Sequence, residues 1–127
     1  MTKILVIDDE DGIRLGIAEY LRFENYEVYD APNGKIGLEL AREHVPDLIV
    51  CDIMMPELDG YGVLDGLRQN HQTQNIPFVF LTAKADRDSH RKGMSGGADD
   101  YVTKPFTFNE LLQTIRARLE RRQTLLG

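Results

Sequence analysis

The segment that most restricts the fold is an uninterrupted apolar run, Leu48 to Cys51, which leads directly into Asp52. So short an apolar run, followed closely by the turn-forming residues Pro56 and Gly60, is typical of a strand buried on both faces. Strands of this kind occur in parallel sheets that carry helices on either side. Asp52 would therefore lie at the carboxyl end of its strand, the edge at which open α/β sheets place ligands and chemistry.

Strand and helix patterns alternate along the remainder of the chain. Four further strands are predicted, at Lys3 to Ile7, Glu27 to Ala31, Phe78 to Leu81 and Asp100 to Val102. The spacing of apolar residues predicts helices over 11–25, 35–44 and 61–68, a weakly anchored one over 86–97, and a last one beginning near Thr107 or Asn109. This alternation predicts a three-layer α/β/α sandwich with a five-stranded parallel sheet and five helices.

Length and composition limit the function further. The 127 residues suffice for one domain with a substantial core, and a net charge of −6 argues against direct binding to nucleic acid. The single cysteine, Cys51, lies in an apolar strand, which excludes an intrachain disulfide and favours a reducing compartment. Because no secretion signal or membrane-spanning run is visible, we expect a cytoplasmic domain over 1–121, with 122–127 as a tail or the start of a linker.

Complementary polar groups follow four of the predicted strands: Asp8 and Asp9, then Asp52, Thr82 and Lys104. If the strands are parallel, these groups meet at one edge of the sheet. Three carboxylates at close range repel one another unless a cation is present, and Mg²⁺ accepts carboxylates together with phosphate oxygens. A hydroxyl and an ammonium group could hold the remaining oxygens of a transferred phosphoryl group. Asp52 would then be the nucleophile, and an aspartyl phosphate the product.

Each of these residues also has a simpler interpretation. Asp8 to Glu10 could cap the following helix, Thr82 could be chosen for its β-propensity, Lys104 could be a surface lysine, and Asp52 could form a turn. Four strands that end in chemically complementary groups are harder to attribute to chance. The combination therefore favours a site.

Four motifs of the chain resemble the receiver domain of response regulators, the phospho-acceptor module of two-component signalling: ILVIDDE, DLIVCDIMMPELDG, FLTA and GADDYVTKPF. The resemblance extends over essentially the whole chain. It implies a flavodoxin-like, doubly wound sheet with strand order 2-1-3-4-5. It also implies that Asp52 accepts a phosphoryl group from a phosphohistidine, and that the domain is a phospho-acceptor, not a turnover enzyme.

The resemblance also implies a metal site. Asp9, Asp52 and the backbone carbonyl of Met54 would bind Mg²⁺, for which Mn²⁺ could substitute, and Asp8 would act through water. Lys104 would bind the phosphoryl oxygens.

A conformational switch is implied as well. Thr82 would bind the phosphoryl group and move toward it, and the ring of Tyr101 would turn into the space that Thr82 leaves. The peptide bond before Pro105 would be cis. The segment 86–97 is poor in apolar residues and rich in glycine, so its packing would cost little to rearrange. We expect the changed surface to consist of this segment, the fifth strand and the last helix.

The implied partners are a sensor histidine kinase or phosphotransfer protein, and an output domain or effector protein. A phosphorylation-dependent homodimer is a further implied partner. The winged-helix class of these regulators pairs through matched charges on its receivers. Asp100 and Glu110 resemble half of that set, whereas His90 and Thr114 stand where arginines occur in the class. Dimerisation through that particular face is therefore not expected.

Two other classes share the layout or the chemistry. A haloacid-dehalogenase-like phosphatase would carry its nucleophile after the first strand in a D-x-D arrangement, whereas Asp8 and Asp9 are adjacent. A flavodoxin-like flavin-binding protein would need a loop rich in glycine and hydroxyl groups after that strand, and an acidic loop would repel the flavin phosphate. A third alternative is a receiver module that belongs to a larger kinase, cyclase or transcription factor.

Overall fold

The computed structural model describes residues 1–83 and 98–126, with side chains as far as Arg121. The helix predicted over 86–97, which includes His90, lies outside the described residues. The described residues form five strands and four helices: β1 (Lys3–Ile7), α1 (Asp11–Phe23), β2 (Glu27–Ala31), α2 (Gly34–His44), β3 (Leu48–Asp52), α3 (Gly60–Arg68), β4 (Phe78–Ala83), β5 (Asp100–Lys104) and α5 (Phe108–Leu126).

The five strands form one parallel sheet in the order β2-β1-β3-β4-β5, which confirms the predicted topology. The register is fixed at the carboxyl ends. Ile7 lies beside Cys51, Asp52 beside Leu81, and Ala83 beside Lys104. Because all the strands run the same way, the residues at the carboxyl ends of the strands lie together along one edge.

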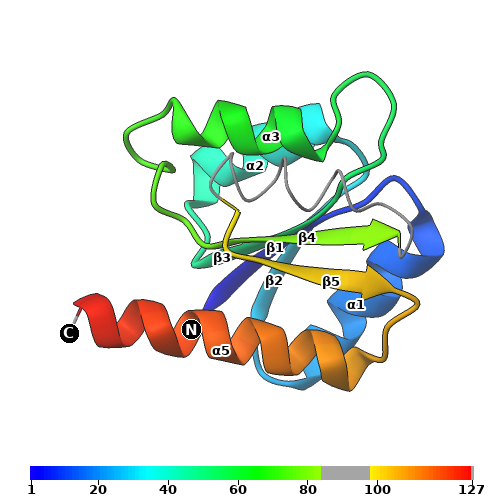
Figure 1. Ribbon diagram of the computed structural model, residues 1–127, viewed down its shortest axis with the longest axis vertical. Helices are drawn as coiled ribbons and strands as arrows, with labels where there is room; N and C mark the ends of the chain where they lie inside the picture. Colours follow the sequence, from blue (N-terminus) through cyan, green and yellow to red (C-terminus); the bar gives the residue numbers. More distant parts are fainter. Residues whose placement is uncertain (84–97, 127) are drawn as a thin grey trace.

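Two hydrophobic clusters hold the helices against the sheet, one on each face. Successive strand residues point to opposite faces, so Leu5 and Ile7 pack under α2 and α3, whereas Ile4 and Val6 pack against α1 and α5. Figure 1 shows the resulting three layers, with α2 and α3 above the sheet and α1 and α5 below it. Every residue of β3 is buried, which confirms the interpretation of this strand as central.

Two strands extend beyond their predicted ends. β4 continues to Ala83 and β5 to Lys104, so Thr82 is part of β4 and not a residue that follows it. The pairing of Thr82 with Thr103 continues the ladder past the last apolar residue of β4. Apolar runs report burial, whereas strand length depends on pairing, and the two differ here.

Three helices begin at a side-chain cap. The Asn33 carboxamide oxygen accepts a hydrogen bond from the backbone N–H of Ile36 at 2.9 Å, and the Asp59 carboxylate accepts one from Gly62 at 2.9 Å. The Thr107 hydroxyl accepts one from the N–H of Glu110 at 3.0 Å, which identifies Thr107 as the residue that caps α5. The helical backbone of α5 runs on to Leu126, into the segment predicted to be a tail or the start of a linker.

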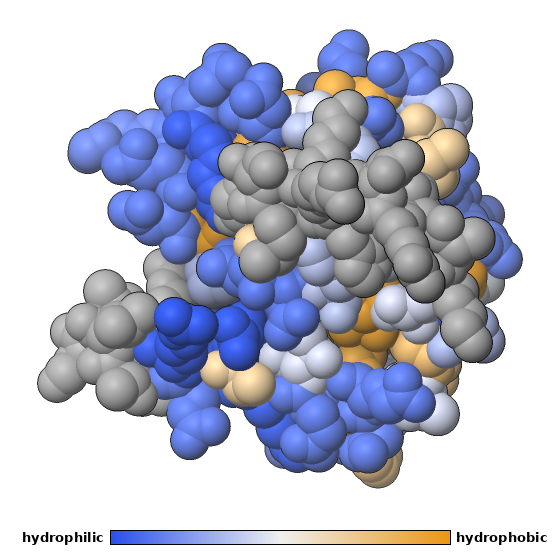
Figure 2. Space-filling model, viewed as in Figure 1, coloured by the Kyte–Doolittle hydropathy of each residue, from blue (hydrophilic) through white to orange (hydrophobic). Residues whose placement is uncertain are grey.

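The described part of the face drawn in Figure 2 is mainly polar. Hydrophilic side chains make up most of the described surface in the view of Figure 2, and apolar side chains appear in small separate areas. None of the helices in the described part of the chain is both long enough and apolar enough to cross a bilayer. Cys51 is buried and has a free thiol.

Candidate functional site

Three carboxylates gather at the carboxyl edge of the sheet. Asp8 and Asp9 follow β1, and Asp52 ends β3, so the pairing of Ile7 with Cys51 places the two strand ends side by side. One carboxylate oxygen from each of the three residues lies within 4.8 Å of the others. Asp8 and Asp52 are buried, whereas Asp9 is exposed. The sequence prediction that these acids converge is borne out by this geometry.

Lys104 completes the charged group from the far side of β4. Its Nζ lies 3.4 Å from Asp52 Oδ1 and 3.6 Å from Asp8 Oδ2. The Lys104–Pro105 peptide bond is cis, the isomer that the sequence resemblance implies. Lys104 is therefore not a free surface lysine, because its ammonium group is directed at the acidic cluster.

The environment of Asp52 disfavours its charged form. Its side chain is only 11% exposed, and burial, followed by repulsion from Asp8, raises the pKa of Asp52 to about 6. Lys104 acts in the opposite direction and limits the shift. Near pH 7 the carboxyl is therefore mostly ionised and able to act as a nucleophile, yet poorly solvated.

One oxygen of Asp8 lacks a hydrogen bond. Asp8 Oδ1 accepts a hydrogen bond from the backbone N–H of Glu10 at 2.9 Å, whereas Oδ2 is buried without a hydrogen-bond partner among the described residues. Burial is the main cause that raises the pKa of Asp8. A buried carboxylate oxygen that faces other carboxylates is suited to a metal-bound water or a cation. The donor set thus fits a hard divalent ion.

Asp8 and Glu10 do not serve chiefly as a side-chain cap. The N-cap of α1 is Glu10, whose side chain makes no capping hydrogen bond. The contact between the Asp8 carboxylate and the Glu10 N–H precedes the helix. Helix capping therefore explains the contact of only one of the two carboxylate oxygens of Asp8. It does not explain why Asp9 lies beside Asp52.

Thr82 and Tyr101 lie on β4 and β5, the two strands beyond β3 on this side of the sheet. Thr82 is buried, and its hydroxyl donates a long hydrogen bond of 3.4 Å to the carbonyl of Ala83. The partly buried ring of Tyr101 lies 5.7 Å from that of Phe80, measured between centroids. The Met54 side chain is exposed. The phosphoryl-binding, switch and metal-binding roles of these residues stay predictions.

The turn after β3 requires a glycine where the chain turns into α3. The N–H of Gly60 donates to the carbonyl of Ile53 at 2.8 Å. A Cβ at this position would lie 2.6 Å from the backbone oxygen of Asp52. In the sequence Gly60 is marked only as a turn residue, because the close approach of two backbones has no local signal.

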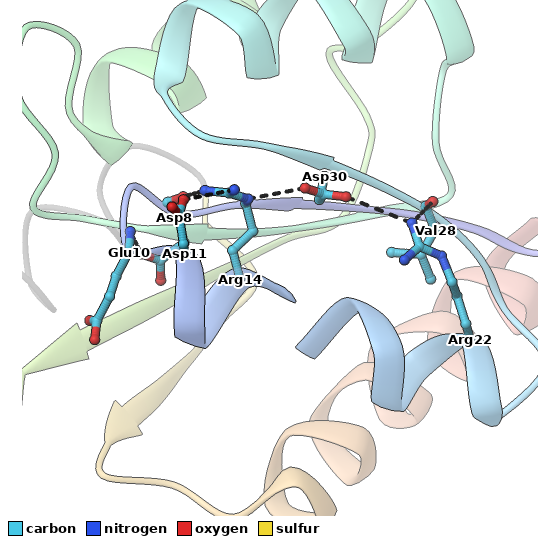
Figure 3. Close-up of polar contacts among 7 residues, drawn as sticks. All are labelled: Asp8, Glu10, Asp11, Arg14, Arg22, Val28 and Asp30. Atoms are coloured by element: carbon cyan, nitrogen blue, oxygen red, sulfur yellow. Dashed lines mark hydrogen bonds and ion pairs between the residues drawn. The ribbon is translucent and has the colours of Figure 1, made fainter. Parts of the chain in front are cut away.

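Sequence reasoning missed a buried arginine beneath the cluster. Periodicity places Arg14 among the polar residues of the first helix, yet its side chain is only 10% exposed. Its Nη1 donates to the carbonyl of Asp8 at 3.0 Å, and its Nε donates to Asp30 Oδ1 at 3.0 Å (Figure 3). An arginine at a polar position of an amphipathic helix gives no indication that it turns inward.

The sequence matches the family described as the response regulator receiver domain over residues 4–116. A curated relative, the transcriptional regulatory protein SrrA of Staphylococcus aureus strain NCTC 8325 / PS 47, is 41% identical over 122 residues. The match covers 96% of this chain but 49% of SrrA, so the chain spans about half the length of the curated relatives that it matches.

Solved structures give the same result. A response regulator receiver domain protein from Clostridium thermocellum superposes with a TM-score of 0.90 at 31% identity, over 98% of this chain and 99% of the other. The chemotaxis protein CheY4 of Vibrio cholerae superposes with a TM-score of 0.88 at 30% identity, over 92% of this chain and 98% of that one.

Proposed function

This chain belongs to the response regulator receiver domain family, and from that premise we propose that Asp52 is its phospho-acceptor. The donor is the phosphohistidine of a sensor histidine kinase or phosphotransfer protein. A carboxylate oxygen of Asp52 attacks phosphorus, the O–P bond forms, and the N–P bond to the imidazole breaks. The observation that carries the proposal is the approach of the Lys104 Nζ to 3.4 Å from Asp52 Oδ1.

Lys104 and Thr82 would stabilise the transferred group. Lys104 already carries a positive charge beside the acceptor, so it can pair with a phosphoryl oxygen without a large rearrangement. Among the described residues, the Thr82 hydroxyl makes a long hydrogen bond of 3.4 Å to the Ala83 carbonyl, which it would give up to donate to the phosphoryl group. Both groups supply positive charge or a donor where negative charge develops.

Asp9, Asp52 and the carbonyl of Met54 would hold Mg²⁺, with Asp8 acting through water and Mn²⁺ as a substitute. Support comes from the three carboxylates that lie within 4.8 Å of one another and from the buried Asp8 oxygen without a hydrogen bond. When bound, the ion neutralises charge on the acids and the phosphoryl oxygens. The fold would hold the three carboxylates close together before the ion binds.

The domain would act as a switch and not as a turnover enzyme. Phosphorylation brings additional negative charge to a buried residue. Movement of Thr82 and rotation of Tyr101 would transmit this change to the surface made of the 86–97 segment, β5 and α5. That surface would control an output domain or an effector protein, and the longer curated relatives, which are transcriptional regulators, support an attached output domain.

The same proposal covers the domain's setting. Residues 1–121 would form the receiver, and 122–127 a tail or the start of a linker, into which α5 continues as far as Leu126. A cytoplasmic location is supported by the buried free thiol of Cys51. The net charge of −6 supports protein partners and not nucleic acid. A second copy of the chain, in a homodimer formed on phosphorylation, is the remaining partner to test. Light scattering with and without a phosphoryl donor would measure the change in molecular mass.

Incubation with Mg²⁺ and acetyl phosphate tests the chemistry directly. Intact-mass spectrometry should detect a single added phosphoryl group, and Asp52→Asn should abolish it. Asp65→Asn, a change at an exposed acid of α3 away from the edge, is the matched control and should leave the modification unchanged. Full phosphorylation of Asp52→Asn would show that another residue is the acceptor.

A further inference from the structure

Arg14 has no role in the phosphotransfer scheme above, although it is buried directly beneath the acidic cluster. Its guanidinium donates to the backbone of Asp8 and is held from the other side by Asp30. We propose that Arg14 is a positioning residue, which fixes the peptide between Asp8 and Asp9 so that both carboxylates face Asp52 and a divalent ion. This inference rests on the proposed metal site and adds a residue that supports it.

The three nitrogens of Arg14 each have an oxygen partner. Nη1 donates to the carbonyl of Asp8 at 3.0 Å, Nε donates to Asp30 Oδ1 at 3.0 Å, and Nη2 lies 2.8 Å from Asp11 Oδ1. Figure 3 shows the side chain reaching from α1 to the end of β1 on one side and to β2 on the other. The fork geometry of a guanidinium suits such a bridge, and an ammonium cannot reproduce it.

The contact matters because of the atom that it holds. The carbonyl of Asp8 and the N–H of Asp9 belong to one planar peptide group, so fixing the carbonyl orients the start of Asp9. Asp8 is otherwise held by its N–H, which donates to the carbonyl of Ala31 at 3.1 Å, and by its Oδ1. Because the Glu10 N–H occupies Oδ1, the carboxylate oxygen of Asp8 left for the cluster is Oδ2.

Asp30 is the anchor of Arg14, and Asp11 is not. The Asp11 side chain is 77% exposed, and a pair this exposed contributes little. Asp30 is only 24% exposed and accepts from Arg14 at 3.0 Å. Its other oxygen lies 3.7 Å from Arg22, which also donates to the carbonyl of Val28 at 2.9 Å. Arg22 thus shares the partner of Arg14, but among the described residues it makes no hydrogen bond or ion pair with Asp8 or Asp9.

This difference provides matched variants for a metal-binding test. We would titrate the full chain with Mn²⁺, measured as free ion by electron paramagnetic resonance, for the wild type, Arg14→Lys, Arg14→Gln and Asp30→Asn. The Kd for Mn²⁺ should rise about tenfold in both Arg14 variants, as is usual when a residue that orients metal ligands is lost. Asp30→Asn should give a smaller rise. Arg22→Gln and Asp11→Asn should keep the wild-type Kd.

Arg14→Lys separates geometry from charge. If the positive charge alone mattered, lysine would preserve the wild-type Kd, and Arg14→Gln would bind Mn²⁺ more tightly because repulsion of the ion is removed. Either result would overturn the inference. A higher Kd for Mn²⁺ in both Arg14→Lys and Arg14→Gln supports the inference. If Arg14→Gln does not fold, the Kd values of Arg14→Lys and Asp30→Asn decide in the same way.

Urea unfolding without metal distinguishes positioning from simple bracing. A brace would lower the free energy of unfolding in the Arg14 variants while the Kd for Mn²⁺ stayed at its wild-type value, and that pattern would overturn the inference. Absence of Mn²⁺ binding by the wild-type protein would instead overturn the proposed metal site. The two failures are therefore distinguishable.

Discussion

At the scale of single residues, Asp52 is buried at the carboxyl edge of the sheet, where its ionisation costs free energy. Burial and the nearby Asp8 raise its pKa to about 6 from an ordinary value of 3.8, while Lys104 opposes the shift. Between pH 3.8 and about pH 6, the folded protein therefore binds more protons than the unfolded chain. As pH rises through this window the contribution of Asp52 to stability is lost, and above pH 6 the residue destabilises the metal-free fold.

Asp52→Asn should stabilise the metal-free protein. At pH 7.5 in the presence of a chelator, we expect the free energy of unfolding to rise by about 2 kcal/mol, because the amide carries no charge to desolvate. The gain should shrink as pH is lowered toward 4, where the wild-type carboxyl is itself protonated. Urea unfolding at both pH values measures this. A gain of equal size at both would mean that ionisation is not the cause.

At the scale of elements, the site depends on how closely β3 and α3 approach each other. The turn between them brings the N–H of Gly60 to within 2.8 Å of the carbonyl of Ile53. A side chain at Gly60 would meet backbone atoms of Asp52 and Ile53, which cannot move aside without displacing the end of β3. The backbone path, and not a side-chain contact, thus positions the carboxyl end of β3.

Gly60→Ala should lower stability and disturb the site together. The added methyl would lie 2.6 Å from the Asp52 carbonyl oxygen, and overpacking of this kind costs roughly 1–3 kcal/mol. Gly12→Ala in α1 is the control, since a Cβ there has no neighbour within 4 Å. That control should gain up to about 1 kcal/mol from helix propensity. Urea unfolding and the extent of phosphorylation by acetyl phosphate measure both effects; equal stability of the two variants would contradict the close-approach interpretation.

At the scale of the whole molecule, the parallel sheet is what converts separate strand ends into one site. Asp52 and Lys104 are 52 residues apart in the chain, yet their side chains come within 3.4 Å. The cluster combines two buried acids, an exposed acid and one ammonium group. Such a site concentrates negative charge before any ion binds, so ion binding should be coupled to folding.

Mg²⁺ should therefore stabilise the fold. At a free concentration about 100 times its Kd, the free energy of unfolding should rise by about 2.7 kcal/mol, because the ion binds only the folded arrangement. Differential scanning calorimetry with Mg²⁺ or with a chelator would detect this as a higher Tm. Asp9→Asn removes the exposed carboxylate of the cluster and should abolish most of the rise. An equal rise in that variant would place the ion elsewhere.

The sequence by itself determined the three layers, the parallel direction of the strands and the position of the acids at the carboxyl edge of the sheet. Local periodicity is enough for this, since it reports which side of each element is buried, and the residues after each strand must meet where parallel strands end. The motifs around Asp52 and Lys104 also identified the family. The helix expected over 86–97 lies outside the described residues and stays a prediction.

Only the tertiary structure decided the inward turn of Arg14, the close approach at Gly60 and the ion pair of Asp8 Oδ2 with Lys104. Each depends on atoms brought together from different elements: Arg14 of α1 meets the end of β1 and Asp30 of β2. A polar residue on a helix carries the same local pattern whether it faces solvent or a buried partner. Contacts of this kind are set by register and packing, which no stretch of neighbouring residues encodes.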